Sequence, residues 1–120
     1  MPADRIVLGL LSDLPSLIAV AVVDVGTGML LASHSNYARF NLDLAAAYNT
    51  QVVKQSLKSM KDVSSSTGKL EEIFVTVADQ LHLIKLLPKE EVFVFLAVNS
   101  LDINMAMATQ MIQRHTPEFI

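Results

Sequence analysis

The residues that could carry phosphate chemistry gather in one short segment, Asp24-Val-Gly-Thr-Gly28, which follows an apolar run. In some ATPases a segment of this kind wraps phosphate with backbone amides while its carboxylate positions a metal. That chemistry needs a second phosphate loop and a second lobe, and 120 residues do not hold them. We therefore interpret the segment as a hairpin turn in which glycine supplies positive φ angles.

Other patterns that would indicate catalysis are weak. Gly68-Lys69 lacks the remaining residues of a nucleotide-binding P-loop. The three histidines, His34, His82 and His115, fall in different predicted elements and have no ligand partner at metal-binding spacing. Cysteine is absent, which excludes disulfides and thiolate chemistry. The sequence therefore predicts a protein that is not an enzyme, with no catalytic residues, metal site or cofactor.

Composition narrows the class of protein further. The net charge is −3 and the basic residues are scattered, which argues against nucleic-acid binding. The longest apolar stretch, Ile6–Val23, is interrupted by Asp13 and Pro15, so no membrane span is expected. No signal peptide is recognisable, and we expect a cytoplasmic protein with residues 1–120 forming a single domain.

Two charge-free runs, Leu17–Val23 and Val92–Val98, are apolar on both alternating faces. Strands of this kind must be covered on both sides, so the sheet should lie between helical layers. We predict helices over Ala3–Leu14, over Leu42 to about Lys61 with Asn41 as the N-cap, and from a cap at Ser100 or Asp102 to about His115. We predict strands over Leu17–Val23, Met29–Ser33, Leu70–Ala78, Leu81–Leu87 and Val92–Val98, with a linker over Val63–Lys69 and a hairpin turn at Asp79-Gln80.

Methionines cluster on the last predicted helix, at Met105, Met107 and Met111. Methionine fills irregular gaps in protein cores, so core packing is the first interpretation. An adaptable surface for a partner is the alternative.

The long central helix carries an unusually wide apolar face. Projected at about 100° per residue, this face spans about 180°, whereas a helix lying on one sheet needs only about 100°. The arc reaches beyond that limit at Tyr48 and Val52. We therefore predict a homodimer in which a second helix packs on this flank, with Leu44, Tyr48, Val52 and Gln55 near the two-fold axis.

Several stretches of the chain resemble the Roadblock / dynein light chain family. They are Asp13–Asp24, Gly26–Ser33, the alanine-bearing long helix, Gly68–Val75, and the last strand, which ends at Asn99 before a helix of methionine and alanine. The resemblance lies in pattern and order and covers nearly the whole chain. It implies an α+β fold with a five-stranded antiparallel sheet, the long helix on one face and the terminal helices on the other.

The resemblance also implies a function. Members of the family pair through the long helix and the third strand, which here contains Ile73 and Val75, and serve as platforms for Ras-like GTPases. The exposed polar residues expected to contact such a partner are Arg39, Asp43, Lys54 and Lys58. A structural adaptor in a larger complex is one alternative. A small-molecule sensor is another, although the apolar strands offer few polar residues to line a cavity.

Overall fold

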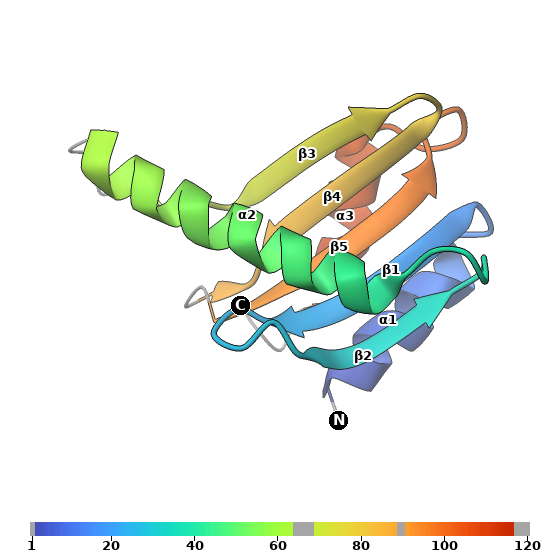
Figure 1. Ribbon diagram of the computed structural model, residues 1–120. Helices are drawn as coiled ribbons and strands as arrows, with labels where there is room; N and C mark the ends of the chain where they lie inside the picture. Colours follow the sequence, from blue (N-terminus) through green and yellow to red (C-terminus); the bar gives the residue numbers. More distant parts are fainter. Residues whose placement is uncertain (1, 64–68, 89–90, 117–120) are drawn as a thin grey trace.

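The computed structural model describes residues 2–63, 69–88 and 91–116. Its elements follow the predicted order along the chain (Figure 1). They are α1 (Pro2–Asp13), β1 (Leu17–Asp24), β2 (Leu30–Ser35), α2 (Leu42–Val63), β3 (Glu72–Val77), β4 (Gln80–Leu86), β5 (Val92–Asn99) and α3 (Met105–Arg114).

The five strands form one antiparallel sheet in the order β2-β1-β5-β4-β3. The two charge-free runs become β1 and β5, two of the three inner strands, which pair with each other. Nearly every residue of both strands is buried. The sequence prediction that these strands are covered on both faces is therefore confirmed, and β2 and β3 form the two edges.

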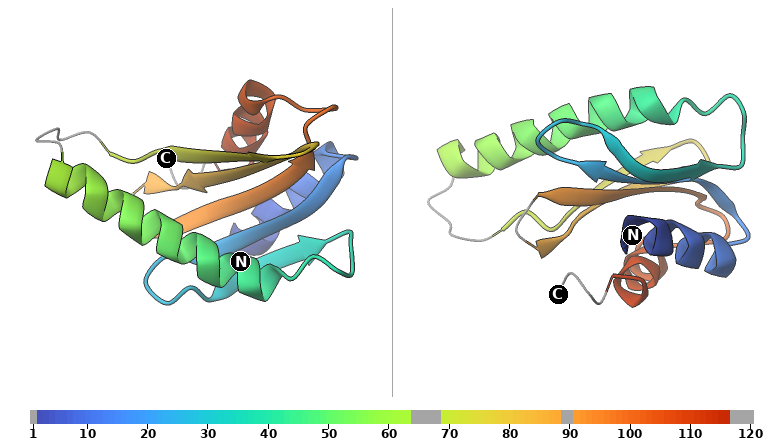
Figure 2. Two further views of the ribbon diagram at one scale, coloured as in Figure 1. Left: turned by 45° about the horizontal axis from the view of Figure 1, so that its top comes forward. Right: turned by 90° about the horizontal axis from the view of Figure 1, so that it is seen from below.

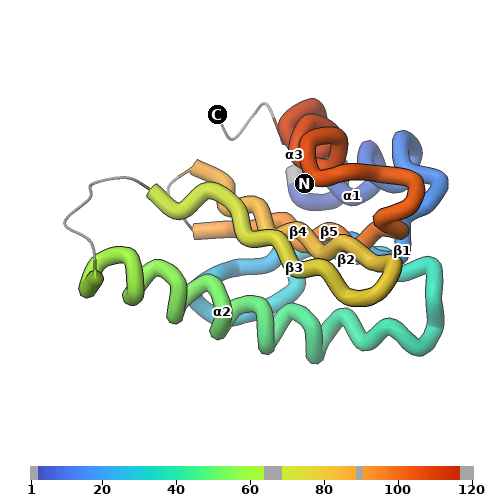
Figure 3. Tube along the Cα trace, turned by 90° about the horizontal axis from the view of Figure 1, so that it is seen from above, coloured from blue at the N-terminus to red at the C-terminus, as the bar shows by residue number. Residues whose placement is uncertain are grey.

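The sheet lies between two helical layers (Figures 2 and 3), with α2 on one face and α1 and α3 together on the other. Alternating side chains of each strand divide the core accordingly. Val20 and Leu96 belong to the cluster that packs with α1 and α3, while Ala21 and Phe95 belong to the cluster beneath α2. The predicted α+β architecture is thus confirmed in its layers and strand number.

The start of α2 is fixed by its predicted cap. The backbone amide of Leu44 donates to Asn41 Oδ1 at 3.0 Å, which satisfies one of the free amides of the first turn. Asp43 occupies that turn, where a negative charge is favoured. Midway along the helix, Thr50 is buried and donates its hydroxyl to the carbonyl of Ala46 at 2.7 Å.

The predicted start of the last helix is wrong. The helix begins at Met105, and its N-cap is Asn104, whose side chain accepts from the Met107 amide at 2.9 Å. The segment before it forms a turn instead, because Asn99 Oδ1 accepts from the Leu101 amide at 2.9 Å. Ser100 and Asp102 therefore lie in this turn and cap no helix.

Core packing is also the wrong interpretation for two of the three methionines. Met105 and Met107 are 50% and 40% exposed, whereas Met111 packs against the buried cluster. The buried face of α3 consists of Ala108 and Ile112.

The hairpin of β3 and β4 differs in detail from the prediction. Strand β3 covers Glu72–Val77 within the predicted Leu70–Ala78, and the turn lies at Ala78 and Asp79. Residues 64–68 of the predicted linker and residues 89–90 of the turn before β5 lie outside the described ranges.

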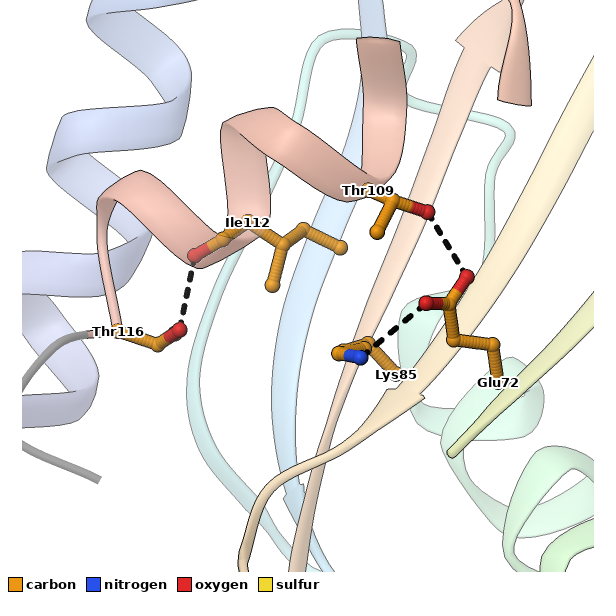
Figure 4. Close-up of polar contacts among 5 residues, drawn as sticks. All are labelled: Glu72, Lys85, Thr109, Ile112 and Thr116. Carbon is orange, nitrogen blue, oxygen red and sulfur yellow. Dashed lines mark hydrogen bonds and ion pairs between the residues drawn. The ribbon is translucent and has the colours of Figure 1, made fainter. Parts of the chain in front are cut away.

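A polar contact ties this hairpin to α3. Figure 4 shows Glu72 between two partners, Lys85 Nζ at 3.1 Å and Thr109 Oγ1 at 2.8 Å. One carboxylate thus joins β3, β4 and α3 on the face of the sheet opposite α2.

Candidate functional site

The segment Asp24–Gly28 is a hairpin turn, as the sequence analysis expected. Asp24 Oδ2 accepts hydrogen bonds from the hydroxyl and the backbone amide of Thr27, at 2.7 and 2.9 Å. These two bonds, the hydroxyl one first, lower the pKa of the Asp24 carboxyl. Gly28 has a φ of +74° and lies against Thr50 of α2, so a side chain here would be strained. The Asp24 carboxylate therefore stabilises the hairpin turn through its two hydrogen bonds to Thr27.

Each of the three histidines lies within hydrogen-bonding distance of one side-chain oxygen. His34 lies 2.7 Å from Asn36 Oδ1, and His115 lies 2.6 Å from Asp13 Oδ2. Among the residues that the structure describes, no group of three His, Asp or Glu side chains could hold a metal ion. No helix in the described ranges is both long enough and apolar enough to cross a membrane.

The outer side of α2 presents a line of exposed apolar residues. Leu44, Tyr48 and Val52 are 50%, 65% and 40% exposed. They follow one another at a spacing of four residues, which stacks side chains on one side of a helix. The sheet-facing residues of α2 are Ala46, Thr50 and Val53. The apolar arc at Tyr48 and Val52 thus extends beyond what the subunit's own sheet covers, as the sequence analysis expected.

The two flanks of α2 face different parts of the sheet. Lys54 Nζ donates to the carbonyl of Gly26 at 3.2 Å, so its flank faces the turn between β1 and β2. Val52 precedes Lys54 by two residues and lies about 160° away around the helix. Its flank therefore faces the half of the sheet that contains β4 and β3 (Figure 1).

Strand β3 also presents exposed apolar residues on the face of the sheet that carries α2. Its register with β4 places Ile73, Val75 and Val77 on the α2 side of the sheet, where Ile73 packs against the α2 cluster. Val75 and Val77 are 43% and 53% exposed. Within the described residues β3 pairs only with β4, so its other edge offers unpaired backbone groups. We call Leu44, Tyr48, Val52, Val75 and Val77 the apolar flank.

The four predicted partner-binding residues do not form one cluster. Arg39 lies in the loop before α2, Asp43 in the first turn of the helix, and Lys54 and Lys58 three to four turns further along. Arg39, Asp43 and Lys58 are exposed, as is Lys54 beside Gly26. Asp43, Lys54 and Lys58 lie on one side of α2, whereas Arg39 lies outside the helix.

A cleft at one end of the sheet was missed by the sequence analysis. It has a volume of about 390 Å³ and lies between the loop before α2, the tip of the β3–β4 hairpin and the ends of β1 and β5. Its lining residues are Ile18, Tyr37, Arg39, Phe40, Asp79, Gln80 and Asn99. Besides Tyr37, four lining residues are polar or charged: Arg39, Asp79, Gln80 and Asn99. The sequence analysis had expected few polar residues to line a cavity. No single segment signals the cleft, because its residues come from four separate parts of the chain.

Comparison with known proteins adds the fold class. No family model matches the sequence, and no curated protein does. Solved structures do match. MglB from Myxococcus xanthus is 14% identical over 98% of this chain and 87% of its own, with a TM-score of 0.75. A Roadblock/LC7 domain from Streptomyces avermitilis is 13% identical over 96% and 95%, with a TM-score of 0.74. An MglB structure with a tetrameric arrangement is 14% identical over 98% of this chain and 87% of its own, with a TM-score of 0.78.

These matches define the class of the molecule. The chain has a Roadblock-type fold, with the five-stranded antiparallel sheet and three helices that its structural neighbours share.

Proposed function

We propose that the chain is a non-enzymatic, homodimeric platform that binds a small Ras-like GTPase and regulates it. One observation carries the homodimer: α2 and the edge strand β3 both present exposed apolar residues on the same face of the sheet. The GTPase partner rests on the resemblance of the sequence to the Roadblock family. An uncovered apolar surface next to an open strand edge is an aggregation hazard. A second copy related by a two-fold axis would cover it with the same surface.

The dimer that we propose uses both elements. The two α2 helices pack together with Leu44, Tyr48, Val52 and Gln55 near the axis. The two β3 strands pair edge to edge, with Ile73 and Val75 at the seam, and join the sheets into one. The MglB structure with a tetrameric arrangement supports self-association of this fold.

The GTPase would bind the paired α2 helices on the flank that carries Lys54 and Lys58, away from the apolar flank. Arg39, Asp43, Lys54 and Lys58 are the proposed contacts, because they are exposed at or near that side. The platform would act by holding the partner's switch loops in one of their existing arrangements. Arg39 is the one arginine outside the terminal helices and thus the candidate arginine finger. We propose that the platform acts by positioning the switch loops of the partner and supplies no arginine finger.

The test measures binding and GTP turnover with a Ras-like GTPase encoded beside the gene for this chain. A regulator should prefer one nucleotide state of the GTPase and change its turnover. Lys58→Ala should weaken binding by about tenfold or less, as expected for one charge at the rim of an interface. Arg114→Ala is the matched control on the opposite face of the sheet, where Arg114 is 63% exposed and its pair with Asp13 contributes little.

Each outcome separates the alternatives. Stimulated turnover that Arg39→Ala abolishes without loss of binding would replace positioning by a finger mechanism. Binding with unchanged turnover would leave a structural adaptor. Absence of binding in either nucleotide state would contradict the proposed partner.

A further inference from the structure

The cleft beside the loop before α2 has a preformed apolar floor. The Phe40 ring lies 6.0 Å from the His82 ring, edge to face, and 6.1 Å from the ring of Phe95. Ile18 is only 8% exposed and completes the floor. Burial lowers the pKa of His82, which favours its neutral form within this aromatic group. The floor is therefore held in place without a ligand.

Two amide side chains on the wall are oriented by the protein. Gln80 Oε1 lies 2.9 Å from His82 Nε2, and Asn99 Oδ1 accepts from the Leu101 amide at 2.9 Å. Both amide oxygens are thus engaged, and each side chain keeps an NH₂ group that can donate. The wall offers hydrogen-bond donors above an apolar floor, which is the usual composition of a small-molecule site.

The rim carries one cation and one anion from different segments. Arg39 comes from the loop before α2, and Asp79 comes from the tip of the β3–β4 hairpin. In the described part of the chain, neither side chain has a hydrogen-bond or ion-pair partner. The hairpin tip is also unusual, because Ala78 has a φ of +54°, a conformation that normally favours glycine. Alanine restricts the tip more than glycine would and so helps to hold Asp79 at the rim.

We propose that this cleft binds a small zwitterion with an apolar body, such as a free amino acid or a dipeptide. Arg39 binds the carboxylate, Asp79 binds the ammonium group, and the apolar body lies on Ile18 and Phe40. A volume of about 390 Å³ suits a ligand of this size. The inference goes beyond the proposed GTPase platform, and its test contains no GTPase, so either can fail without the other.

The experiment follows the amide resonances of the ¹⁵N-labelled full chain by NMR during titration with L-leucine or with the dipeptide Leu-Leu. Saturable shifts are expected at Phe40, Gln80 and Asn99. N-acetyl-leucine lacks the cation and leucinamide lacks the anion, and each should bind at least about tenfold more weakly than leucine, the factor for one lost charged contact of about 1.4 kcal/mol. Whichever of leucine and Leu-Leu has the lower dissociation constant indicates whether the ligand is an amino acid or a peptide.

Charge-neutral variants assign each end of the ligand. Arg39→Gln should abolish the preference for leucine over leucinamide, and Asp79→Asn should abolish the preference for leucine over N-acetyl-leucine. Lys61→Gln and Asp62→Asn remove exposed charges from the last turn of α2, at the end of the helix away from the cleft, and should leave both preferences intact.

Three results would overturn the inference. The first is no saturable shift with either zwitterion up to about 10 mM, which corresponds to negligible affinity. The second is a set of shifts confined to residues away from the cleft. The third is a preference for leucine over its derivatives that persists in both Arg39→Gln and Asp79→Asn.

Discussion

Gly9 on α1 faces the imidazole ring of His115, the residue that follows α3. A methyl group on Gly9 would overlap this ring. The ring has little freedom to move, because its Nε2 is held 2.6 Å from Asp13 Oδ2 and its side chain is only 21% exposed. Glycine at position 9 therefore allows α1 to approach α3.

We predict that Gly9→Ala destabilises the protein by about 1–3 kcal/mol, the usual cost of overpacking. Helix propensity alone would favour alanine over glycine by about 1 kcal/mol. In a His115→Ala background the overlap is gone, and the same change should become neutral or stabilising. Urea unfolding of the four proteins of this double-mutant cycle measures the difference. A stabilising Gly9→Ala in the otherwise unchanged protein would contradict the role of this contact.

Among the elements, β3 is the one whose environment the proposed dimer changes most. If two β3 strands pair, the amides of Ile73–Val77 that point away from β4 become hydrogen-bonded. We predict that β3 in the dimer exchanges its amide hydrogens as slowly as Val92–Val98 in the centre of the sheet. Because dilution dissociates the dimer, the amide exchange of β3 should become faster at low protein concentration. The opposite edge strand, β2 (Leu30–Ser35), is the internal control and should keep its fast-exchanging amides at every concentration.

Hydrogen–deuterium exchange at two protein concentrations provides this measurement. Fast exchange in β3 at a concentration where light scattering reports a dimer would indicate an interface made by α2 alone.

The elements also differ in how well the sequence predicts them. The inner strands β1 and β5 are evident because burial on both faces demands uninterrupted apolar residues. The start of α3 is not evident from the sequence, because Ser100, Asp102 and Asn104 are all acceptable caps. The choice depends on Asn99, which closes a turn through the Leu101 amide and delays the helix to Met105.

The candidate site likewise has one part that the sequence predicts and one part that it does not. The apolar residues Leu44, Tyr48 and Val52 lie within one helix, so their spacing alone predicts a shared face. The cleft depends on strand register, which brings Gln80 opposite Asn99. Periodicity predicts faces of elements and carries no information about such pairings between distant segments.

For the whole molecule, the main expectation is a dimer built on the apolar flank. Val52 is 40% exposed in the single subunit, so a charged residue there should allow the subunit to fold. In the dimer the same position would bury a carboxylate without a partner, at a cost of several kcal/mol. We predict that Val52→Glu raises the dimer dissociation constant by at least about 100-fold.

Lys61→Glu is the matched control, because it introduces the same side chain on the other flank of α2, roughly 180° around the helix from Val52. Sedimentation equilibrium should show a dimer for the unchanged protein and for Lys61→Glu, and a folded monomer for Val52→Glu. Circular dichroism confirms that each variant retains its helices. Val52→Glu lowers the net charge by one unit and Lys61→Glu lowers it by two, so dissociation by Lys61→Glu equal to or greater than that by Val52→Glu would indicate that net charge, and not the apolar flank, controls association. An unchanged protein that is monomeric at micromolar concentration would exclude the dimer, and the apolar flank would then have to be covered by a different chain.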